Sequence, residues 1–288
     1  MNWGQTKTIF IICFLLLDVF LGYKLWQDRH EYHEMYETEG ERNLDQLIEN
    51  KDIDTTGITM PDADQEVTFL EGTPVDFNGE EIKKALNKLS GSNKKNPVFS
   101  YTLNDDGTQL QATFTKPLAL SSEPSAVEIN NFLSKYVYKG NEYQYWSSEK
   151  TDEMTVYHFV LSYDGHLVFS IPKNDISTLS VQVRDGKIMG YEQTYMHLEG
   201  SEKKMPMTVK PKEALQNLWS QNYLLTSRHP KIVAFYLCYI NMNQDIDEQT
   251  TANYIPAWYI KVKFDDGEKE YFVSDLNIQE IDDKETEE

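Results

Sequence analysis

The chain has few cysteines and no acceptor motif for N-glycosylation. Its 288 residues include only 2 Cys, one at Cys13 in an apolar run and the other at Cys238 in a predicted strand. Two cysteines in such different settings cannot form a disulfide framework, so no internal disulfide is expected. The absence of any Asn-x-Ser/Thr motif gives no sign of a eukaryotic glycosylating pathway. A bacterial surface setting fits these features better.

Basic residues are also scarce. The 27 Lys and Arg face 47 Asp and Glu, which gives a formal net charge of -20. A field of this sign repels nucleic-acid phosphates and anionic lipid headgroups, so nucleic acid is excluded as a partner. The chain is nevertheless 40% hydrophobic and contains 18 Tyr, 13 Phe and 5 Trp. That is enough material for the packed core of one or two domains.

One long apolar run occurs, at residues 8–26 (TIFIICFLLLDVFLGYKLW), and its only charges are Asp18 and Lys24. As a helix it would extend roughly 28 Å, which matches the hydrocarbon thickness of a bilayer. No small-residue processing site follows the run, so a retained transmembrane anchor is favoured over a cleaved signal peptide. We expect a single-pass protein of the cell membrane. Flanking charges do not decide its orientation, but a short tail before a long acidic part is typical of a cytoplasmic N-terminus and an extracytoplasmic bulk.

Asp18 lies near the middle of this predicted anchor. A carboxylate at the bilayer centre costs about 2.5–3.5 kcal/mol, so it tends to face protein rather than lipid. Helical spacing predicts a face that contacts a partner helix, formed by Ile11, Phe14, Leu15, Asp18, Leu21, Gly22 and Leu25. The alternative is a protonated or snorkelling Asp18 that the membrane merely tolerates.

Charge and turn composition divide the chain into five parts. Residues 27–63 are a highly charged stalk and linker, and the sequence GSEKK at 200–204 is the clearest internal boundary. The predicted organisation is a cytoplasmic tail and transmembrane anchor at 1–26, the stalk and linker at 27–63, an extracytoplasmic α+β subdomain at 64–199, a second at 205–280 and an acidic frayed tail at 281–288.

Four Asp-Gly pairs separate alternating apolar runs, at 106–107, 164–165, 185–186 and 266–267. Asp-Gly tolerates the positive φ angles of tight hairpins, so each pair predicts two antiparallel strands. The predicted strand pairs are 98–104 with 109–115, 155–162 with 166–171, 178–183 with 187–195, and 257–264 with 269–273. Helical periodicity adds helices at 79–89, 125–137 and 210–224. The predicted fold class is α+β, with helices packed on one face of antiparallel sheets.

Several short motifs suggest chemistry but are incomplete. Ser-x-x-Lys occurs four times without the Lys-Thr-Gly and Ser-Asp-Asn elements of an acyl-transfer site, so no catalytic residue is assigned. A metal could bind at His30, His33 and Glu34, but a solvated stalk explains these residues more simply. The polar stretch from Asn241 to Asp247 lacks the Gly and the Glu of a calcium loop. No metal or cofactor is predicted.

A cluster of aromatic residues suggests one ligand-binding hypothesis. It consists of Tyr143, Tyr145, Trp146 and Tyr157, which could form a surface that stacks on sugars. Alternating aromatics in strands more often fill the face of a sheet, which is the simpler reading.

The chain resembles the YycI (WalI) family. The resemblance rests on the N-terminal segment NWGQTKTIFIICFLLLDVFLGYKLW, the charged stalk, the segment VDFNGEEIKKAL and the C-terminal YIPAWYIKVKFDDGEKEYFV. It implies tandem α+β domains like those of YycH, and a last unit that resembles a PepSY module. It also implies contacts of the transmembrane helix and outer domain with a WalK (YycG) histidine kinase and a YycH-like companion, which would tune signalling through WalR (YycF). It implies no catalysis.

Two functions therefore compete. The first is a non-enzymatic regulator of a sensor kinase that controls cell-wall homeostasis through protein contacts. The second is an extracytoplasmic ligand-binding module or enzyme of the cell wall. The first is favoured because no nucleophile, base and orienting group can be assembled from recognisable motifs.

Overall fold

The structure is a computed structural model that describes residues 44–91, 96–121, 126–151, 153–170, 178–241, 251–275 and 277–281. The predicted anchor, its contact face at Ile11, Phe14, Leu15, Asp18, Leu21, Gly22 and Leu25, most of the stalk and the tail from residue 282 lie outside these ranges. Within the ranges described, no helix has both the length and the apolar character needed to cross a membrane.

The chain divides into two compact units, Met1–Asp54 and Thr55–Glu288. The described part of the first unit contains the short helix α2 (Leu44–Glu49), which begins with an acidic first turn at Asp45. The chain turns at Lys51, where φ is 61°, and the N–H of Ile53 donates to the carbonyl of Leu47 over 3.1 Å.

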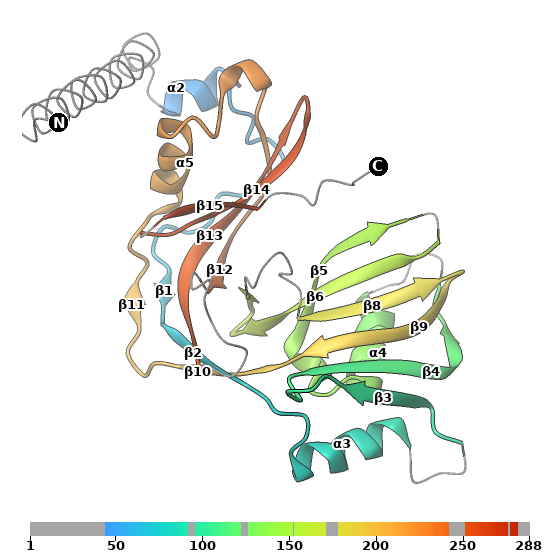
Figure 1. Ribbon diagram of the computed structural model, residues 1–288. Coiled ribbons are helices and arrows are strands. Elements are labelled where there is room, and N and C mark those ends of the chain that lie inside the picture. The colour runs from blue at the N-terminus through green and yellow to red at the C-terminus, as the bar shows by residue number, and fades with distance from the viewer. Residues whose placement is uncertain are drawn as a thin grey trace, which may run out of the picture. The chain divides into compact units, whose positions relative to one another are not determined.

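Among the residues that the structure describes, all the strands lie in the second unit (Figure 1). In chain order they are β1 (Glu66–Val67), β2 (Leu70–Pro74), β3 (Phe99–Leu103), β4 (Gln109–Ala119), β5 (Tyr143–Lys150), β6 (Thr155–Tyr163), β7 (His166–Phe169), β8 (Leu179–Arg184), β9 (Lys187–Thr194), β10 (Met196–Gly200), β11 (Met205–Pro206), β12 (Lys231–Ile240), β13 (Ala252–Phe264), β14 (Gly267–Val273) and β15 (Ile278–Ile281). Its α-helices are α3 (Glu80–Ser90), α4 (Ala126–Tyr136) and α5 (Pro211–Ser220), with 3-10 turns η1 (Gly140–Glu142) and η2 (Thr226–Arg228).

Thirteen strands form one sheet whose main path is β10-β2-β13-β12-β7-β6-β8-β9-β4-β3. Strand β5 pairs with β6, β14 with β13, and β15 with β14, while β1 and β11 form a separate two-stranded sheet. Neighbours are antiparallel except β7 and β12, which are parallel from the Cys238/Leu167 pair to the Ile240/Phe169 pair. The predicted α+β class is confirmed as a mixed fold with a large, mainly antiparallel sheet and few helices.

All four Asp-Gly pairs lie at hairpin turns, as predicted. Strands β6 and β7 close at the Tyr163/His166 pair, and β8 and β9 close at the Arg184/Lys187 pair. The two central residues of both turns have positive φ, 50° and 83° in the first turn and 50° and 68° in the second. This is the signature of a type I′ turn, whose twist matches the flanking strands. In the last hairpin, Gly267 already pairs with Phe264, so the two preceding aspartates form the loop.

The three predicted helices are present, and the third is shorter than expected. Helix α3 ends at Gly91, which adopts the left-handed conformation that favours glycine. Helix α5 ends at Ser220 rather than continuing to residue 224. Asn222 is left-handed with φ of 65°, its N–H donates to the carbonyl of Trp219, and the N–H of Tyr223 donates to the carbonyl of Leu218. This is a Schellman ending, which Asn supports in place of Gly.

Strand pairings connect the two predicted subdomains. Strand β13 pairs with β2 at the Ala252/Gly72 and Tyr254/Leu70 pairs, and β2 also pairs with β10. The hydroxyl groups of Ser170 and Tyr254 lie 2.7 Å apart. A division at 200–204 therefore separates segments that share one hydrogen-bonded sheet, and it stays a prediction.

Two clusters of buried apolar side chains stabilise the sheet. The larger cluster joins α3, α4 and the strands from β3 to β9, and the rings of Phe99, Phe114, Phe132 and Tyr191 meet within it at centroid distances of 5.5–6.4 Å. Figure 1 shows α4 behind the strands of this part of the sheet. The smaller cluster joins β5, β6 and β7 to β12, β13 and β14 and includes Phe169, Tyr259 and Phe272. Burial of these large side chains supplies most of the driving force for folding.

Candidate functional site

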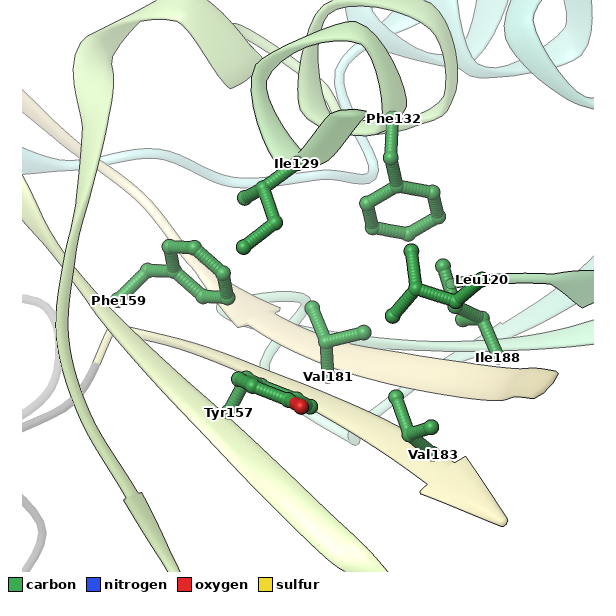
Figure 2. A pocket seen from close by; sticks show the side chains of 8 residues that line it. All are labelled: Leu120, Ile129, Phe132, Tyr157, Phe159, Val181, Val183 and Ile188. Atoms are coloured by element: carbon green, nitrogen blue, oxygen red, sulfur yellow. The ribbon is translucent and has the colours of Figure 1, made fainter. Parts of the chain in front are cut away.

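The described residues form an apolar hollow between α4 and the sheet. Its lining side chains come from the end of β4 and from α4, β6, β8 and β9, and they are Leu120, Ile129, Phe132, Tyr157, Phe159, Val181, Val183 and Ile188 (Figure 2). Figure 2 shows Ile129 and Phe132 extending from the helix toward the valines of the sheet, with Phe159 on one side and Leu120 and Ile188 on the other. Among these eight lining side chains, only that of Tyr157 has a polar atom, its hydroxyl oxygen.

Sequence periodicity explains how these side chains converge. Alternate residues of a strand point to one face, so Tyr157 and Phe159 of β6 share a face with Val181 and Val183 of β8. Ile129 and Phe132 lie three positions apart on α4 and therefore face the same side. The inner hollow encloses only about 10 Å³, which is room for roughly one water molecule.

A wider depression adjoins this inner hollow. It has a volume of about 500 Å³ and shares three lining residues with it, Leu120, Tyr157 and Val183. The remaining lining residues include the polar groups of the rim and are Ala119, Ser121, Thr155, Asp185, Gly186 and Lys187. A volume of this size lies within the range of small-molecule sites. The arrangement combines an apolar floor with a rim that carries hydroxyls, one carboxylate and one ammonium.

Backbone hydrogen bonds position the rim. The N–H of Leu120 donates to the carbonyl of Gly186 over 2.8 Å, which joins the end of β4 to the β8–β9 turn. Ser121 then donates from its N–H and its hydroxyl to the two carboxylate oxygens of Glu128 on α4, at 2.9 Å and 2.6 Å. Leu120 is therefore held by the β8–β9 turn and the adjacent Ser121 by α4.

The two halves of α4 differ in how deeply their apolar side chains are buried. Leu133 is fully buried near the C-terminal end, where the Tyr191 hydroxyl donates to the carbonyl of Tyr136 over 2.8 Å. Ile129, one turn earlier, is only half-buried. The first half of the helix thus contributes the less tightly packed wall of the hollow.

A buried polar network supports the C-terminal end of α4. The Gln193 amide donates to the carbonyl of Tyr138 at 2.7 Å and to the Tyr143 hydroxyl at 2.9 Å, and that hydroxyl donates to the carbonyl of Thr194 at 2.7 Å. Burial raises the pKa of Tyr143, Tyr191 and Tyr195 well above the ordinary tyrosine value. These hydroxyls therefore remain protonated donors, which suits a structural role.

The structure disperses the aromatic cluster proposed from the sequence. Tyr143 is buried in the core, and Trp146 contacts Phe169 at a centroid distance of 5.6 Å, toward the smaller cluster. Tyr157 lines the hollow, while Tyr145 is 50% exposed and lies 6.4 Å from the Tyr157 ring. Only Tyr145 and Tyr157 therefore share one surface, and the four residues do not form a single stacking platform.

A charged cluster occupies the sheet near the smaller core cluster. The Lys261 ammonium lies 3.0 Å from a carboxylate oxygen of each of Glu268 and Glu270. Partial burial acts to lower the pKa of Lys261, but the two carboxylates outweigh it and raise the pKa. The second oxygen of Glu270 is buried and has no hydrogen-bond partner in the described part of the chain. Burial and then the Glu270 charge raise the pKa of the neighbouring Tyr259.

One serine, histidine and glutamate come together in the structure. The Ser180 hydroxyl lies 3.3 Å from Nδ1 of His158, and Nε2 of His158 lies 3.7 Å from a Glu149 oxygen. Their residue types match those of a hydrolase triad, but the distances exceed the usual catalytic hydrogen bonds. The three groups lie on neighbouring strands, and none of them lines the hollow or the depression. We assign them no catalytic role.

The other sequence motifs form no recognisable site among the described residues. Ser147 and Lys150 both lie on β5, and the Lys204 ammonium lies 4.0 Å from an Asp164 oxygen. Ser92, Lys95 and Lys173 lie outside the described residues, as do His30, His33, Glu34 and most of the calcium-like loop. Across the ranges that the structure describes, no group of three or more His, Cys, Asp or Glu is placed to hold a metal.

Sequence reasoning did not predict the hollow or its rim. The Asp185-Gly186 turn and the alternation of Val181 and Val183 were visible in the sequence. The junction of Leu120 with this turn, however, depends on the pairing of β4 with β9, whose partners are separated by about 70 residues. No short-range pattern encodes that contact.

The solved structures that match this chain share little sequence with it. An uncharacterized protein from Eubacterium rectale is 12% identical, with a TM-score of 0.45, 75% of this chain covered and 82% of that one. The YpeB C-terminal domain of Bacillus megaterium is 12% identical, with a TM-score of 0.38 and coverages of 74% and 100%. YycH from Bacillus subtilis is 13% identical, with a TM-score of 0.38 and coverages of 75% and 52%. The comparison with curated proteins gives no match.

A family model gives the stronger result. The model described as "YycI protein" matches residues 34–274, which is most of the chain and nearly all of its described part. This match agrees with the resemblance seen in the sequence. The chain therefore belongs to the YycI family.

Proposed function

We propose that this chain is a membrane-anchored accessory regulator of a WalK-type sensor histidine kinase that controls cell-wall homeostasis. The observation that carries the proposal is the match of the YycI family model over residues 34–274. The regulator acts through protein contacts and not through catalysis. The Ser180–His158 distance of 3.3 Å, which is longer than a usual catalytic hydrogen bond, agrees with that part of the proposal.

The proposed partners are the kinase and a YycH-like companion protein. The apolar run at residues 8–26 crosses the membrane once, with the N-terminus in the cytoplasm and the acidic bulk outside. Asp18 and Gly22 mark the helix face that contacts the partner, because a carboxylate at this depth favours protein neighbours and glycine permits close approach. The outer part contributes a second contact.

The proposal can be tested by separating the two contact regions. One variant keeps residues 1–63 and replaces the remainder with an unrelated extracytoplasmic domain, and the matched variant keeps residues 27–288 and carries an unrelated single-pass helix. Kinase autophosphorylation is measured in membranes that contain each variant at equal protein level. If the membrane helix carries the main contact, the first variant retains the effect and the second loses it. If the full chain, like both variants, leaves kinase autophosphorylation unchanged, the proposal is contradicted.

A ligand-binding role is a second candidate, and one observation favours it. The depression of about 500 Å³ at the β8–β9 turn has the size and mixed lining of a small-molecule site. Such a site and an accessory role in signalling are compatible, because a ligand that changes α4 also changes the surface offered to a partner.

A further inference from the structure

We infer that the two adjoining hollows beside α4 form one binding site for an amphiphile with an alkyl chain and an uncharged, hydroxyl-bearing headgroup. The alkyl chain enters the inner hollow, and the headgroup occupies the wider depression. The site follows from the lining residues and from the different packing of the two ends of α4. It does not depend on the proposed kinase partner.

The inner hollow selects an apolar group. Its walls are aliphatic and aromatic side chains from five segments, and Phe159, Val181 and Ile188 among them are each at most 3% exposed. Apolar cavities of this kind stay dry and accept nonpolar molecules. A polar or charged group placed there would lose its hydration without finding hydrogen-bond partners.

The rim selects a headgroup that is polar but carries no net charge. Asp185 within the turn and Lys187 just after it carry opposite charges, and Ser121 and Thr155 add hydroxyls. The single carboxylate and the single ammonium of this rim balance, so a charged headgroup of either sign would meet a group of like charge. Neighbouring acceptors and donors are well suited to the hydroxyls of a sugar-like group. Tyr157 lines both hollows, and the exposed Tyr145 beside it extends the aromatic surface.

Movement of α4 would let the alkyl chain enter the inner hollow. The inner hollow of about 10 Å³ is too small for an alkyl chain as it stands, so the wall must move. The last turn of α4 is held by the Tyr191 hydrogen bond and by the burial of Leu133. Ile129 is half-buried, so an outward displacement of the first half of the helix breaks fewer apolar contacts, and the Ser121–Glu128 hydrogen bonds that it strains are exposed to solvent.

Photolabelling of the full chain in lipid nanodiscs tests this site. The probe is decyl glucoside with a diazirine at the end of its alkyl chain, and the comparison probe is a decanoate with the same diazirine. We expect the glucoside to label peptides that contain Ile129, Phe132 or Val181, and unlabelled decyl glucoside to compete. We expect decanoate to label these peptides about fivefold less, as the loss of roughly 1 kcal/mol of headgroup interaction implies.

Two variants and a matched control test whether labelling depends on the two hollows. Val183→Phe fills the junction of the two hollows and should reduce labelling about fivefold or more, while Val233→Phe, on the exposed side of β12, should not. If Val183→Phe does not fold, the rim variant Lys187→Met replaces it and should lower labelling severalfold. Labelling that is absent from these peptides, equal with decanoate, or unchanged in the folded variants overturns the inference.

Discussion

The main-chain N–H of Leu120 donates a hydrogen bond to the carbonyl of Gly186 over 2.8 Å. This bond continues the pairing of β4 with β9 beyond the last strand pair, Ala119/Lys187, and brings the chain that leads into α4 against the β8–β9 turn. The turn itself requires positive φ at both central residues. A hairpin that is local in sequence thus positions a rim built from distant segments.

Two glycines should differ sharply in their tolerance of a side chain. A Cβ added to Gly190 would lie 2.3 Å from the carbonyl oxygen of Ala112, whereas one added to Gly165 meets no atom within 4 Å. Gly190→Ala should therefore lower the free energy of unfolding by about 2 kcal/mol or more through the forced backbone shift. Gly165→Ala should cost only about 1 kcal/mol, for its positive φ. Chemical denaturation of both variants measures the difference, and equal losses would contradict the close β4–β9 approach.

The buried network at the end of α4 should be sensitive to loss of one amide. Gln193→Leu removes the donor to the Tyr138 carbonyl and to the Tyr143 hydroxyl. We expect a loss of about 1–3 kcal/mol in unfolding free energy, because a buried acceptor remains unpaired. The matched control is Gln111→Leu, whose exposed side chain bonds Glu192, and it should change stability by less than about 0.5 kcal/mol. Similar thermal unfolding of the two variants would refute the role of the network.

Much of the fold was predictable from local signals, and the candidate site was not. Asp164, Asp185 and their glycines identified hairpins because a type I′ turn depends on two adjacent residues. The end of α5 was misplaced because Asn222, instead of Gly, adopts the left-handed conformation. The pairing of β2 with β13 and of β7 with β12 joins residues far apart in sequence, and no single-sequence pattern specifies such registers. The rim at Leu120 and Lys187 depends on the same kind of long-range pairing.

The β13–β14 hairpin should show a pH-dependent contact. Nδ1 of His229 lies 2.6 Å from an Asp265 oxygen, and this hydrogen bond and the carboxylate charge raise the histidine pKa above its usual value of 6.5. Because the folded pKa is raised, the contact contributes fully below pH 6.5 and is lost as pH rises through the folded pKa. An NMR titration of the His229 ring should give a midpoint above 6.5 that falls in Asp265→Asn. A midpoint that does not respond to this substitution would rule out the contact in solution.

The apolar N-terminal segment supplies a test of partner contact. Asp18→Leu should leave membrane insertion intact or improve it, because it removes a cost of about 2.5–3.5 kcal/mol. It should also weaken co-purification with the kinase or the companion protein and alter kinase output. Val19→Leu, one position off the predicted face, serves as the control. Unchanged association and output of Asp18→Leu at equal protein level would remove this face as the contact.

The most direct test of the accessory role is recovery of the kinase with the full chain from membranes. The full chain and an unrelated single-pass protein of similar charge are each expressed with the kinase at matched levels, and the recovered kinase and its autophosphorylation rate are quantified. We expect more kinase to be recovered with this chain than with the unrelated protein, and we expect the autophosphorylation rate of the kinase to change. Equal recovery with both proteins, together with an unchanged autophosphorylation rate, would contradict the accessory role.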